Sequence, residues 1–575
     1  MTDPTPDEST MNYDVTTPIP DGSTLGTVIP EPFPVPYPST ITPDTVRTYL
    51  LTVRQNNIAA ARSVPLVRIW DETWTLKSVL LGEIDASFEE KLNDTGTGTI
   101  TLFGTHPLKN WLIDQSNLDA DVHVTVDAPF KVRWSGKCSQ ISYKSDDKGF
   151  TYIILTFLAE YEHVKKIICY SNPLLPPEFQ FPKIYMWAGP SIFGIQTLIF
   201  LNLMRRFLPL WKLPENIFDP ASWLANLNPA NWPIICMPGN FFTDTSEWCV
   251  LATRFGNLHD AISYTMKCAG LQLQAIRWLP GDPQPASSWF VLTQPTLVLN
   301  LVNKSGFVGP TGTVIDGLLE TTSVLLATGI SEVQQAIAAD ANPTYLEPTF
   351  FGTIQTQPWV VWQNGLKTGL SGIQTWEMDI HKPLAVTIVT GGKSPGWVND
   401  ALNAAANTII GYIGDVIANA SIGAGLLDST IDDVILAFAA VTDPFRVAGM
   451  GTNCYGEHWA PSTDTAYSLS MIQDIVNGFW DTRGYTTFKI NVINGAPYWV
   501  GKDFDLGDRV GAEIGDTGYI YVDNVYTLKL SWSRTQDPRW DITIGNGLPK
   551  ESPVAFLSYQ FAQIKAITQS LGVST

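Results

Sequence analysis

The chain has 575 residues, of which 45% are hydrophobic and only 16% are charged, and its formal net charge is −20. A single hydrophobic core stops growing at about 250–300 residues, so we expect several domains. The negative charge argues against a surface that grips nucleic acid, because phosphate binding needs clustered lysine and arginine.

The first segment, residues 1–43, contains ten prolines, and the first basic residue of the chain is Arg47. This composition predicts an extended, polyproline II-like arm that is either disordered or lies along a neighbour in an assembly. After the arm, Asp44 is expected to cap a helix that carries Tyr49 and Val53 on one side. The polar start does not fit a secretory signal, and no stretch reaches the ~18 uninterrupted apolar residues of a spanning helix.

Residues 44–165 are expected to form an N-terminal β-rich domain. Around Phe88 apolar and polar residues alternate with the period of a half-buried strand, and the alternation resumes after a turn at Asn93, Asp94 and Gly96. At least five such strands are predicted in this domain, enough for a sandwich or a partly closed barrel.

Residues 166–245 change character, because prolines and tryptophans are frequent there. Within this connecting region, Ser191 to Met204 reads as an apolar helix. Fourteen residues are too few to span a bilayer, so we expect this helix to lie in a core or an interface. Contact with a membrane surface is the alternative.

Residues 246–310 predict a second α+β region. Leu258 to Met266 is expected to form a helix and Leu271 to Trp278 a strand. A Pro-Gly-Asp turn then leads to a return strand that is expected to begin at Trp289.

Residues 311–450 are predicted to be an Ala/Gly-rich helical insertion with a β-like centre. Val314 to Ala339 and Trp397 to Ala440 read as helical, and Phe350 to Val389 as β-like. Small-residue helices of this kind can pack against copies of themselves on an axis. A plug or membrane-perturbing tip is the alternative. Which residues of the insertion would make such contacts is unknown from the sequence.

Residues 451–550 are expected to form a C-terminal β-rich domain. Phe488 to Val492 alternates as a strand, and Asn494 with Gly495 offers the two positive-φ residues of a tight hairpin. Tyr498 to Val500 is then expected to return as the partner strand.

Gly507 and Asp508 are expected to turn the chain into the next strand of this domain. Tyr526 to Trp532 presents an apolar face, with Thr527, Lys529 and Ser531 opposite. The last residues, 551–575, are expected to be a helix or tail.

Motifs that carry chemistry are incomplete. Gly392 to Gly396 fits G-x-S-x-G, but Pro395 has no N–H for an oxyanion hole. Cys454 and His458 lie too close in sequence to form the usual cysteine-hydrolase pair. Aspartates at 503–508 depart from the EF-hand spacing. We therefore expect no catalytic residue, cofactor or metal, and assign the aspartates to a solvated turn.

Two stretches resemble a known family. They are GAPYWVGKDFDLGDRV, from Gly495 to Val510, and LLGEIDASFEEKLNDTGTGTITLFGTHPLKNWLI, from Leu80 to Ile113. Both are similar to parts of tail-tip hub, or minor tail, proteins of siphoviruses that infect mycobacteria and related actinobacteria. They bracket most of the chain in the order and spacing that such hubs use.

The resemblance implies an α+β, β-rich, multi-domain hub with two β-sandwich or barrel-like lobes and a helical insertion. It implies a virion structural protein at the tail tip, synthesised in the host cytoplasm, that closes the tail tube and opens for DNA. A homotrimer is implied, with the distal tail protein, the tape-measure protein and other minor tail proteins as partners. DNA would be bound only in transit, and contact with the host envelope is possible.

The turn residues Asn93, Asp94, Gly96, Asn494, Gly495, Gly507 and Asp508 would then be structural. The alternatives are a tail-associated cell-wall hydrolase, whose paired carboxylates would meet only in space, and a carbohydrate-binding adhesin with exposed tryptophans. Host and receptor cannot be read from the sequence.

Overall fold

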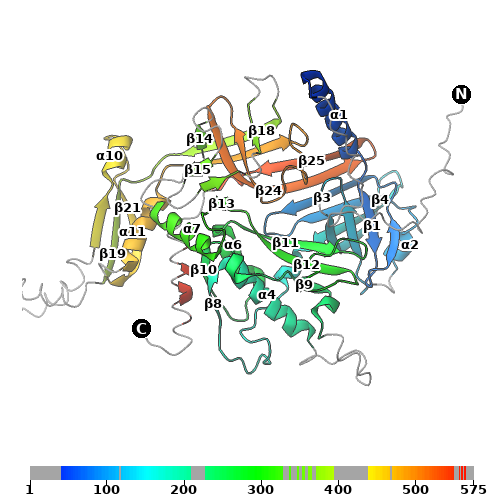
Figure 1. Cartoon of the computed structure of the whole chain (residues 1–575), viewed down its shortest axis with the longest axis horizontal. Helices are drawn as coiled ribbons and strands as arrows, with labels where there is room; N and C mark the ends of the chain where they lie inside the picture. The colour runs from blue at the N-terminus through cyan, green and yellow to red at the C-terminus, as the bar shows by residue number, and fades with distance from the viewer. Residues whose placement is uncertain are drawn as a thin grey trace, which may run out of the picture.

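The computed structural model describes residues 41–114, 118–131, 133–208, 227–327, 336–338, 346–348, 353–356, 360–364, 371–393, 438–465, 469–548, 556, 559–560, 562–564 and 567. In these residues strands dominate and helices cover them, so the predicted β-rich α+β class is confirmed. Figure 1 shows the largest sheet above, a second sheet with α4 and α6 below it, and a small sheet at the opposite side from α1. The domain boundaries expected from the sequence stay predictions.

The largest sheet of the described residues has 14 strands. Its main path runs β18-β22-β25-β24-β3-β4-β7-β6-β5-β1-β2, while β14 and β23 pair with β24, and β17 pairs with β23. Its N-terminal strands are β1 (Leu66–Trp70), β2 (Leu76–Val79), β3 (Asp85–Lys91), β4 (Thr97–Phe103), β5 (His123–Asp127), β6 (Trp134–Ser145) and β7 (Thr151–Ala159). Its C-terminal strands are β14 (Ala336–Ala338), β17 (Val361–Trp362), β18 (Ile373–His381), β22 (Tyr485–Ile493), β23 (Arg509–Glu513), β24 (Tyr519–Ser533) and β25 (Gln536–Ile544).

Strands β3 and β24 join the two ends of the chain in this sheet. They pair antiparallel, with Leu530 opposite Phe88 and Trp532 opposite Ala86. Leu530 and Trp532 are buried in the same core as Phe88 and Trp134. The C-terminal strand therefore completes the core of the N-terminal strands.

A second core lies on the other sheets. Helix α4 (Ser191–Phe207) and α6 (Leu258–Cys268) pack with β9 (Ile234–Cys236), β11 (Leu271–Trp278) and β12 (Thr296–Asn303). Ile195 and Leu198 of α4 are fully buried there, so the core position expected for this apolar helix is confirmed. Beside it, β8 (Tyr185–Pro190) pairs with β10 (Trp248–Thr253), and α7 (Val314–Ala327) packs against β10.

The remaining elements are shorter or peripheral. A three-stranded sheet of β19 (Thr387–Lys393), β20 (Phe438–Thr442) and β21 (Glu457–Thr465) packs against α11 (Leu469–Asp481) and lies near α10 (Pro444–Met450). Another joins β13 (Phe307–Val308), β15 (Leu346–Pro348) and β16 (Thr353–Gln355). The other helices are α1 (Pro43–Ala61), α2 (Lys109–Leu112) and α3 (Glu162–Lys165), with 3-10 turns η2 (Pro229–Asn231) and η3 (Phe241–Thr243).

The hairpin expected after Phe488 to Val492 is wrong. The strand itself is present as β22, but its two edges are occupied by β18 and β25. Tyr498 to Val500 is therefore not its partner. Asn494 and Gly495 do form a turn, closed by a bond from the Ala496 N–H to the Ile493 carbonyl, but of these two residues only Gly495 has the expected positive φ. The backbone groups of β22 that the expected hairpin would have used are hydrogen-bonded to β18 and β25 instead.

Three other expected limits are also wrong. The N-cap of α1 is Thr42, whose hydroxyl accepts the Thr45 N–H, and not Asp44. The return strand after β11 begins at Thr296 and not at Trp289, which lies in the loop and is 71% exposed. The helix expected to continue to Ala339 gives way to β14, which pairs with β24.

The expected helix from Trp397 to Ala440 lies outside the described residues as far as 437, and its last three positions belong to β20. The β-like centre is confirmed where it is described, as β16 to β19.

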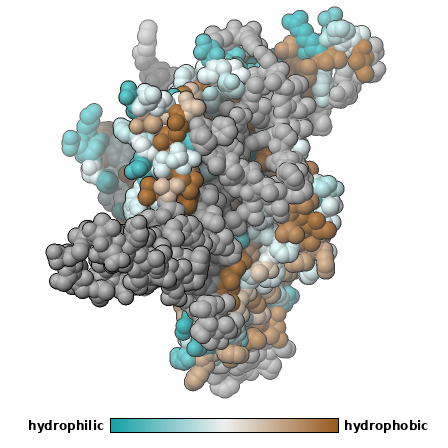
Figure 2. Space-filling model, turned by 90° about the vertical axis from the view of Figure 1, so that its left-hand side faces the viewer, coloured by the Kyte–Doolittle hydropathy of each residue, from teal (hydrophilic) through white to brown (hydrophobic). Residues whose placement is uncertain are grey.

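Among the described residues, no helix is both long enough and apolar enough to cross a membrane. Figure 2 shows hydrophobic and hydrophilic residues intermixed on the face it presents, with several separate apolar patches.

Replacing Trp532 by Ala should destabilise the fold by about 3–5 kcal/mol, because it empties a large buried site and removes the bond from its indole N–H to Glu83 Oε1 at 2.7 Å. The matched control is Trp376→Ala, since Trp376 on β18 is 51% exposed and should cost less than about 1 kcal/mol. Equilibrium unfolding in urea measures both losses, and equal losses would contradict the role given to the β3–β24 seam.

Candidate functional site: a buried polar junction between the sheets

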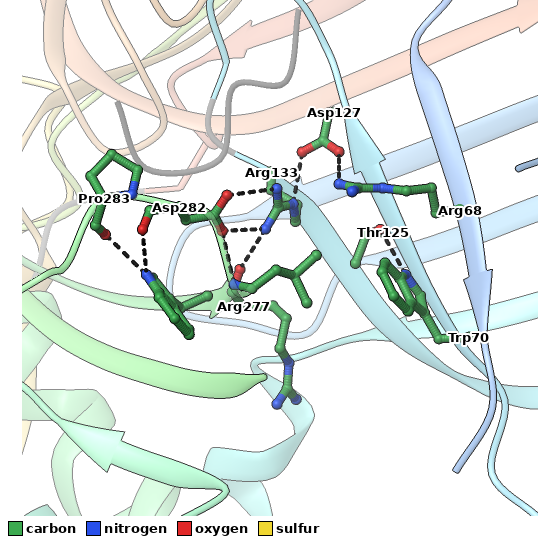
Figure 3. A network of polar contacts seen from close by, with 10 residues as sticks. Arg68, Trp70, Thr125, Asp127, Arg133, Arg277, Asp282 and Pro283 are labelled. Carbon is green, nitrogen blue, oxygen red and sulfur yellow. Dashed lines mark hydrogen bonds and ion pairs between the residues drawn. The ribbon is translucent and has the colours of Figure 1, made fainter. Parts of the chain in front are cut away.

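Charged side chains gather where the N-terminal strands meet β11 (Figure 3). Arg133, just before β6, donates from Nε to Asp127 Oδ1 at 2.7 Å and from Nη1 to Asp282 Oδ2 at 2.6 Å. Arg68 of β1 donates to the other oxygen of Asp127. The side chains of Arg133 and Asp127 are completely buried, so this network fixes the loop after β11 against the large sheet without water between them.

A second pair crosses the same boundary in the opposite direction. Arg277 on β11 donates from Nε and Nη2 to Glu160 Oε1, at 3.0 and 2.8 Å. Burial alone would raise the pKa of Glu160, but the charges of Arg277 and His163 outweigh it and lower that pKa to about 2. The guanidinium of Arg277 also lies 4.2 Å from the ring centre of Trp74, a cation–π contact. Glu160 is therefore a permanent anion at neutral pH.

Lys131 ties the C-terminal strands to the same place. Its ammonium lies 3.1 Å from Glu90 Oε2 and 2.5 Å from Asp505 Oδ1. Burial alone would lower the pKa of Lys131, but the two carboxylates outweigh it and raise the pKa. Three segments far apart in the sequence thus share one buried cation.

The turn residues singled out from the sequence also reach this junction. Asn93, between β3 and β4, donates from Nδ2 to the Leu271 carbonyl at 2.6 Å and accepts the Leu273 N–H at 2.9 Å. Asp508 pairs with Lys304, which follows β12. Two turns from distant parts of the chain therefore bind the same β11–β12 hairpin. The turn at Asn93 binds β11, and the turn at Asp508 binds Lys304 after β12.

The other turn residues lie close by or in their own loops. Asp94 pairs with Lys165, and a Cβ at Gly96 would stand 1.9 Å from the Glu89 carbonyl oxygen. Asn494 Oδ1 accepts the Val500 N–H, while Gly495 has φ +77° against the Trp499 ring. At Gly507 φ is +81°, and its N–H donates to the Val525 carbonyl. All seven are positions where backbone geometry or a short polar side chain decides the residue.

The junction encloses a cavity of only about 100 Å³, bordered by Glu90, Lys131, Glu160 and Asp505. Substrate pockets usually measure about 300–1,000 Å³, so this space suits ordered water rather than a polymer substrate. No group of three His, Cys, Asp or Glu side chains suited to a metal occurs among the described residues. The arrangement is suited to holding sheets together.

The incomplete motifs stay apart from this junction. Cys454 is a free, half-buried thiol before β21, and His458 lies within β21 opposite Ile388. Gly392 and Lys393 end β19, and the rest of the G-x-S-x-G stretch lies outside the described residues. Trp289, Trp376 and Trp459 each expose half or more of their surface, but they belong to a loop, β18 and β21 respectively.

The sequence reasoning missed Arg68, Asp127, Arg133, Arg277 and Asp282. A signal for two of them existed: Arg68 lies between Val67 and Ile69, and Asp127 follows an apolar strand, in a chain with few charges. Charges inside apolar strands are buried only when paired. Arg68 and Asp127 pair with each other across 59 residues, and Arg133 reaches Asp282 across 149 residues, so local patterns could not name these partners.

Two buried carboxylates lie between α7 and β10. Helix α7 approaches β10 closely, since Trp248 donates from N to Thr321 Oγ1 and from Nε1 to the Val314 carbonyl. Burial raises the pKa of Glu320 to about 8. Burial, reinforced by the nearby Glu320, also raises the pKa of Glu247 well above its ordinary value. Burial therefore favours the protonated form of both carboxyl groups in this contact.

Replacing Arg133 by Met should destabilise the protein by about 3–5 kcal/mol, because it leaves Asp127 and Asp282 buried with one cation fewer. The control is Lys137→Met, which removes a cation from an exposed pair with Asp121 and should cost less than about 1 kcal/mol. Urea unfolding of both variants tests this, and a loss at Arg133 no larger than at Lys137 would refute the structural weight of the junction.

Replacing Glu320 by Gln should stabilise the protein increasingly as pH rises from about 4.5 to about 8. Below this window both states carry the proton. Within this window the folded state keeps the proton that the unfolded state has lost. The free energy of unfolding of the wild type therefore falls by about 1.4 kcal/mol per pH unit for one such group. Melting temperatures at pH 5, 6, 7 and 8 measure the difference from wild type. The exposed Glu377→Gln on β18 is the control, and a difference independent of pH would contradict the burial of a neutral Glu320.

Comparisons with known proteins agree with the resemblance read from the sequence. The family model described as Siphovirus ReqiPepy6 Gp37-like protein matches residues 66–546. The chain is 27% identical over 573 residues to minor tail protein Gp28 of Mycobacterium phage L5, covering 89% of this chain and 94% of that protein. It is 26% identical over 571 residues to minor tail protein Gp28 of Mycobacterium phage D29, covering 88% and 94%.

Solved structures with a distant likeness include the tail protein from Neisseria meningitidis MC58, with TM-score 0.36 and 10% identity over 86% of this chain and 99% of that one. Prophage tail protein gp18 from Listeria monocytogenes EGD-e has TM-score 0.34 and 11% identity over 87% and 99%. These likenesses are too low to carry an argument. The sequence matches confirm the predicted resemblance to siphovirus minor tail proteins, and because the family model covers most of the chain, the protein belongs to the siphovirus ReqiPepy6 Gp37-like family.

Proposed function

We propose that this chain is the hub at the tip of a siphovirus tail. In this role it closes the tail tube, anchors other minor tail proteins and opens for DNA passage during infection. Its direct neighbours are the distal tail protein above it and the tape-measure protein inside the tube. The role is structural and not enzymatic.

The observation that carries the proposal is the β3–β24 seam with the polar junction beside it. A hub must transmit force between the tube and the parts bound below without coming apart. Here β3 is hydrogen-bonded to β24 along its whole length, and buried ion pairs join the N-terminal segments to β11 and the loop after it. Asp508 in the C-terminal part pairs with Lys304 after β12. Separating the two ends of the chain therefore requires many bonds to break together.

The charge of the chain fits the passage of DNA. A net charge of −20 produces a repulsive field for phosphates over distances up to about 8–10 Å at physiological salt. A channel wall of this kind lets DNA slide past without adhering. Contact of the 311–450 insertion with the axis or with the host envelope belongs to the same proposal.

Light scattering on the purified full-length protein across a concentration range should give a stable trimer, three times 63.3 kDa. A ring of three subunits matches a sixfold tube when each subunit contributes two similar β-rich lobes to the ring.

Antibody against the chain, bound to intact virions of a phage that encodes it, should label the tail end distal to the capsid in electron micrographs. Labelling along the tail shaft would refute the hub position, whatever the mass in solution.

A further inference from the structure

A large groove lies between α1 and the C-terminal strands, away from the polar junction. Its volume is about 830 Å³. Helix α1 forms one wall, and Trp362, Tyr498 and Trp499 lie on the other. Lys502 bridges the two walls, because its ammonium donates to Asn57 Oδ1 at 3.2 Å. We name this space the α1 groove.

Helix α1 is poorly covered for its length. It has 19 residues, yet only Asn57 is buried, while Leu50 and Leu51 are 58% and 48% exposed. Figure 1 shows α1 projecting from the edge of the body near β25. Helical stability in proteins comes chiefly from packing of an apolar face. A contact along the α1 groove would supply that packing.

The walls of the α1 groove carry positive charge. Arg54 of α1 and Lys502 line it. Arg47 also lies on α1, Arg62 directly follows the helix, and the one acidic residue of α1 is Asp44. Within the described part of the chain, none of these four cations lies within ion-pair distance of a carboxylate. Asp503 also lines the groove, but its carboxylate accepts the Trp499 N–H at 2.7 Å. The groove therefore favours an acidic occupant.

The sequence just before α1 has the matching chemistry. Prolines stand at every second position from Pro30 to Pro38, with Glu31, Phe33, Val35 and Tyr37 between them. Because proline fixes φ near −65° and lacks an N–H, this alternation favours polyproline II. Segments of that kind bind aromatic-lined grooves. Residues 1–40 contain six acidic residues and no lysine or arginine.

The lengths also agree. From Pro43 to Asn57 the helix rises about 21 Å, at 1.5 Å per residue. Nine residues of polyproline II extend about 28 Å. The segment from Pro30 to Pro38, folded back antiparallel to α1, is therefore long enough to run the length of the groove.

We propose that the α1 groove binds the segment Pro30–Pro38 of the same chain. Its prolines, Phe33 and Tyr37 lie against Tyr498 and the apolar side of α1, and Glu31 pairs with Arg54 or Lys502. This docking site does not depend on the hub function, and its test is independent of oligomer mass.

The test is photo-cross-linking of the full-length protein with benzoylphenylalanine in place of Tyr37. After irradiation, mass spectrometry should place the cross-links on residues that line the α1 groove, within single chains on a denaturing gel. The matched control carries benzoylphenylalanine in place of Tyr13, an aromatic position of the arm outside the alternating prolines. Tyr13 should give no preferred cross-link to the groove.

Charge reversal tests the recognition itself. Arg54→Glu combined with Lys502→Glu should lower the cross-link yield roughly fivefold at low salt, since it replaces the exposed attraction for Glu31 by repulsion, a change of about 1 kcal/mol. Added salt should weaken the wild-type yield. Lys148→Glu, in an exposed turn between β6 and β7, should change nothing, and melting curves show that each variant is folded. Cross-links elsewhere on the body, or a yield unaffected by charge reversal, overturn the proposal. Cross-linked dimers overturn it in favour of a second copy as the donor of the segment.

Discussion

The structure depends first on the antiparallel pairing of β3 with β24. Without β24 the N-terminal strands lack Leu530 and Trp532, which complete their core beside Phe88. Without β3 the C-terminal strands end at an open edge, with a row of unpaired backbone groups. Each half of the sheet therefore supplies the other with both apolar surface and hydrogen bonds, and neither set of strands is self-sufficient.

The polar junction adds specificity to this hydrophobic seam. Desolvating Arg133, Asp127 and Arg277 costs free energy that ion pairing only partly offsets. Arg277 donates two bonds to one oxygen of Glu160, and Arg133 binds two carboxylates, so both arginines tie β11 and the loop after it to the large sheet. We interpret the junction as the feature that fixes how the sheets are arranged relative to one another.

The sequence predicted what is local and missed what is distant. Strand β22 was found because Phe488, Ile490 and Val492 alternate, and α4 because its apolar residues run without a break. The partner of β22 was predicted wrongly, since β18 and β25 took the hydrogen bonds that a nearby hairpin would have used. In the same way Asn93 and Asp508 were recognised as turn residues, but nothing near them in the sequence indicates Leu271 or Lys304. Short residue patterns determine backbone preferences, so these can be predicted locally. Sheet order and charge pairing depend on segments some 200 residues apart, so they cannot.

The same seam has a consequence for how the chain is made. About 430 residues separate the end of β3 from the start of β24. At a synthesis rate of about 5–20 residues per second, β3 leaves the ribosome roughly 20–85 s before its partner exists. During that interval its free edge and the unfinished core around Phe88 are open to pairing with other nascent chains. The closing strand thus couples folding to the completion of translation, and chaperones that cover strand edges would act on this protein before its last hundred residues appear.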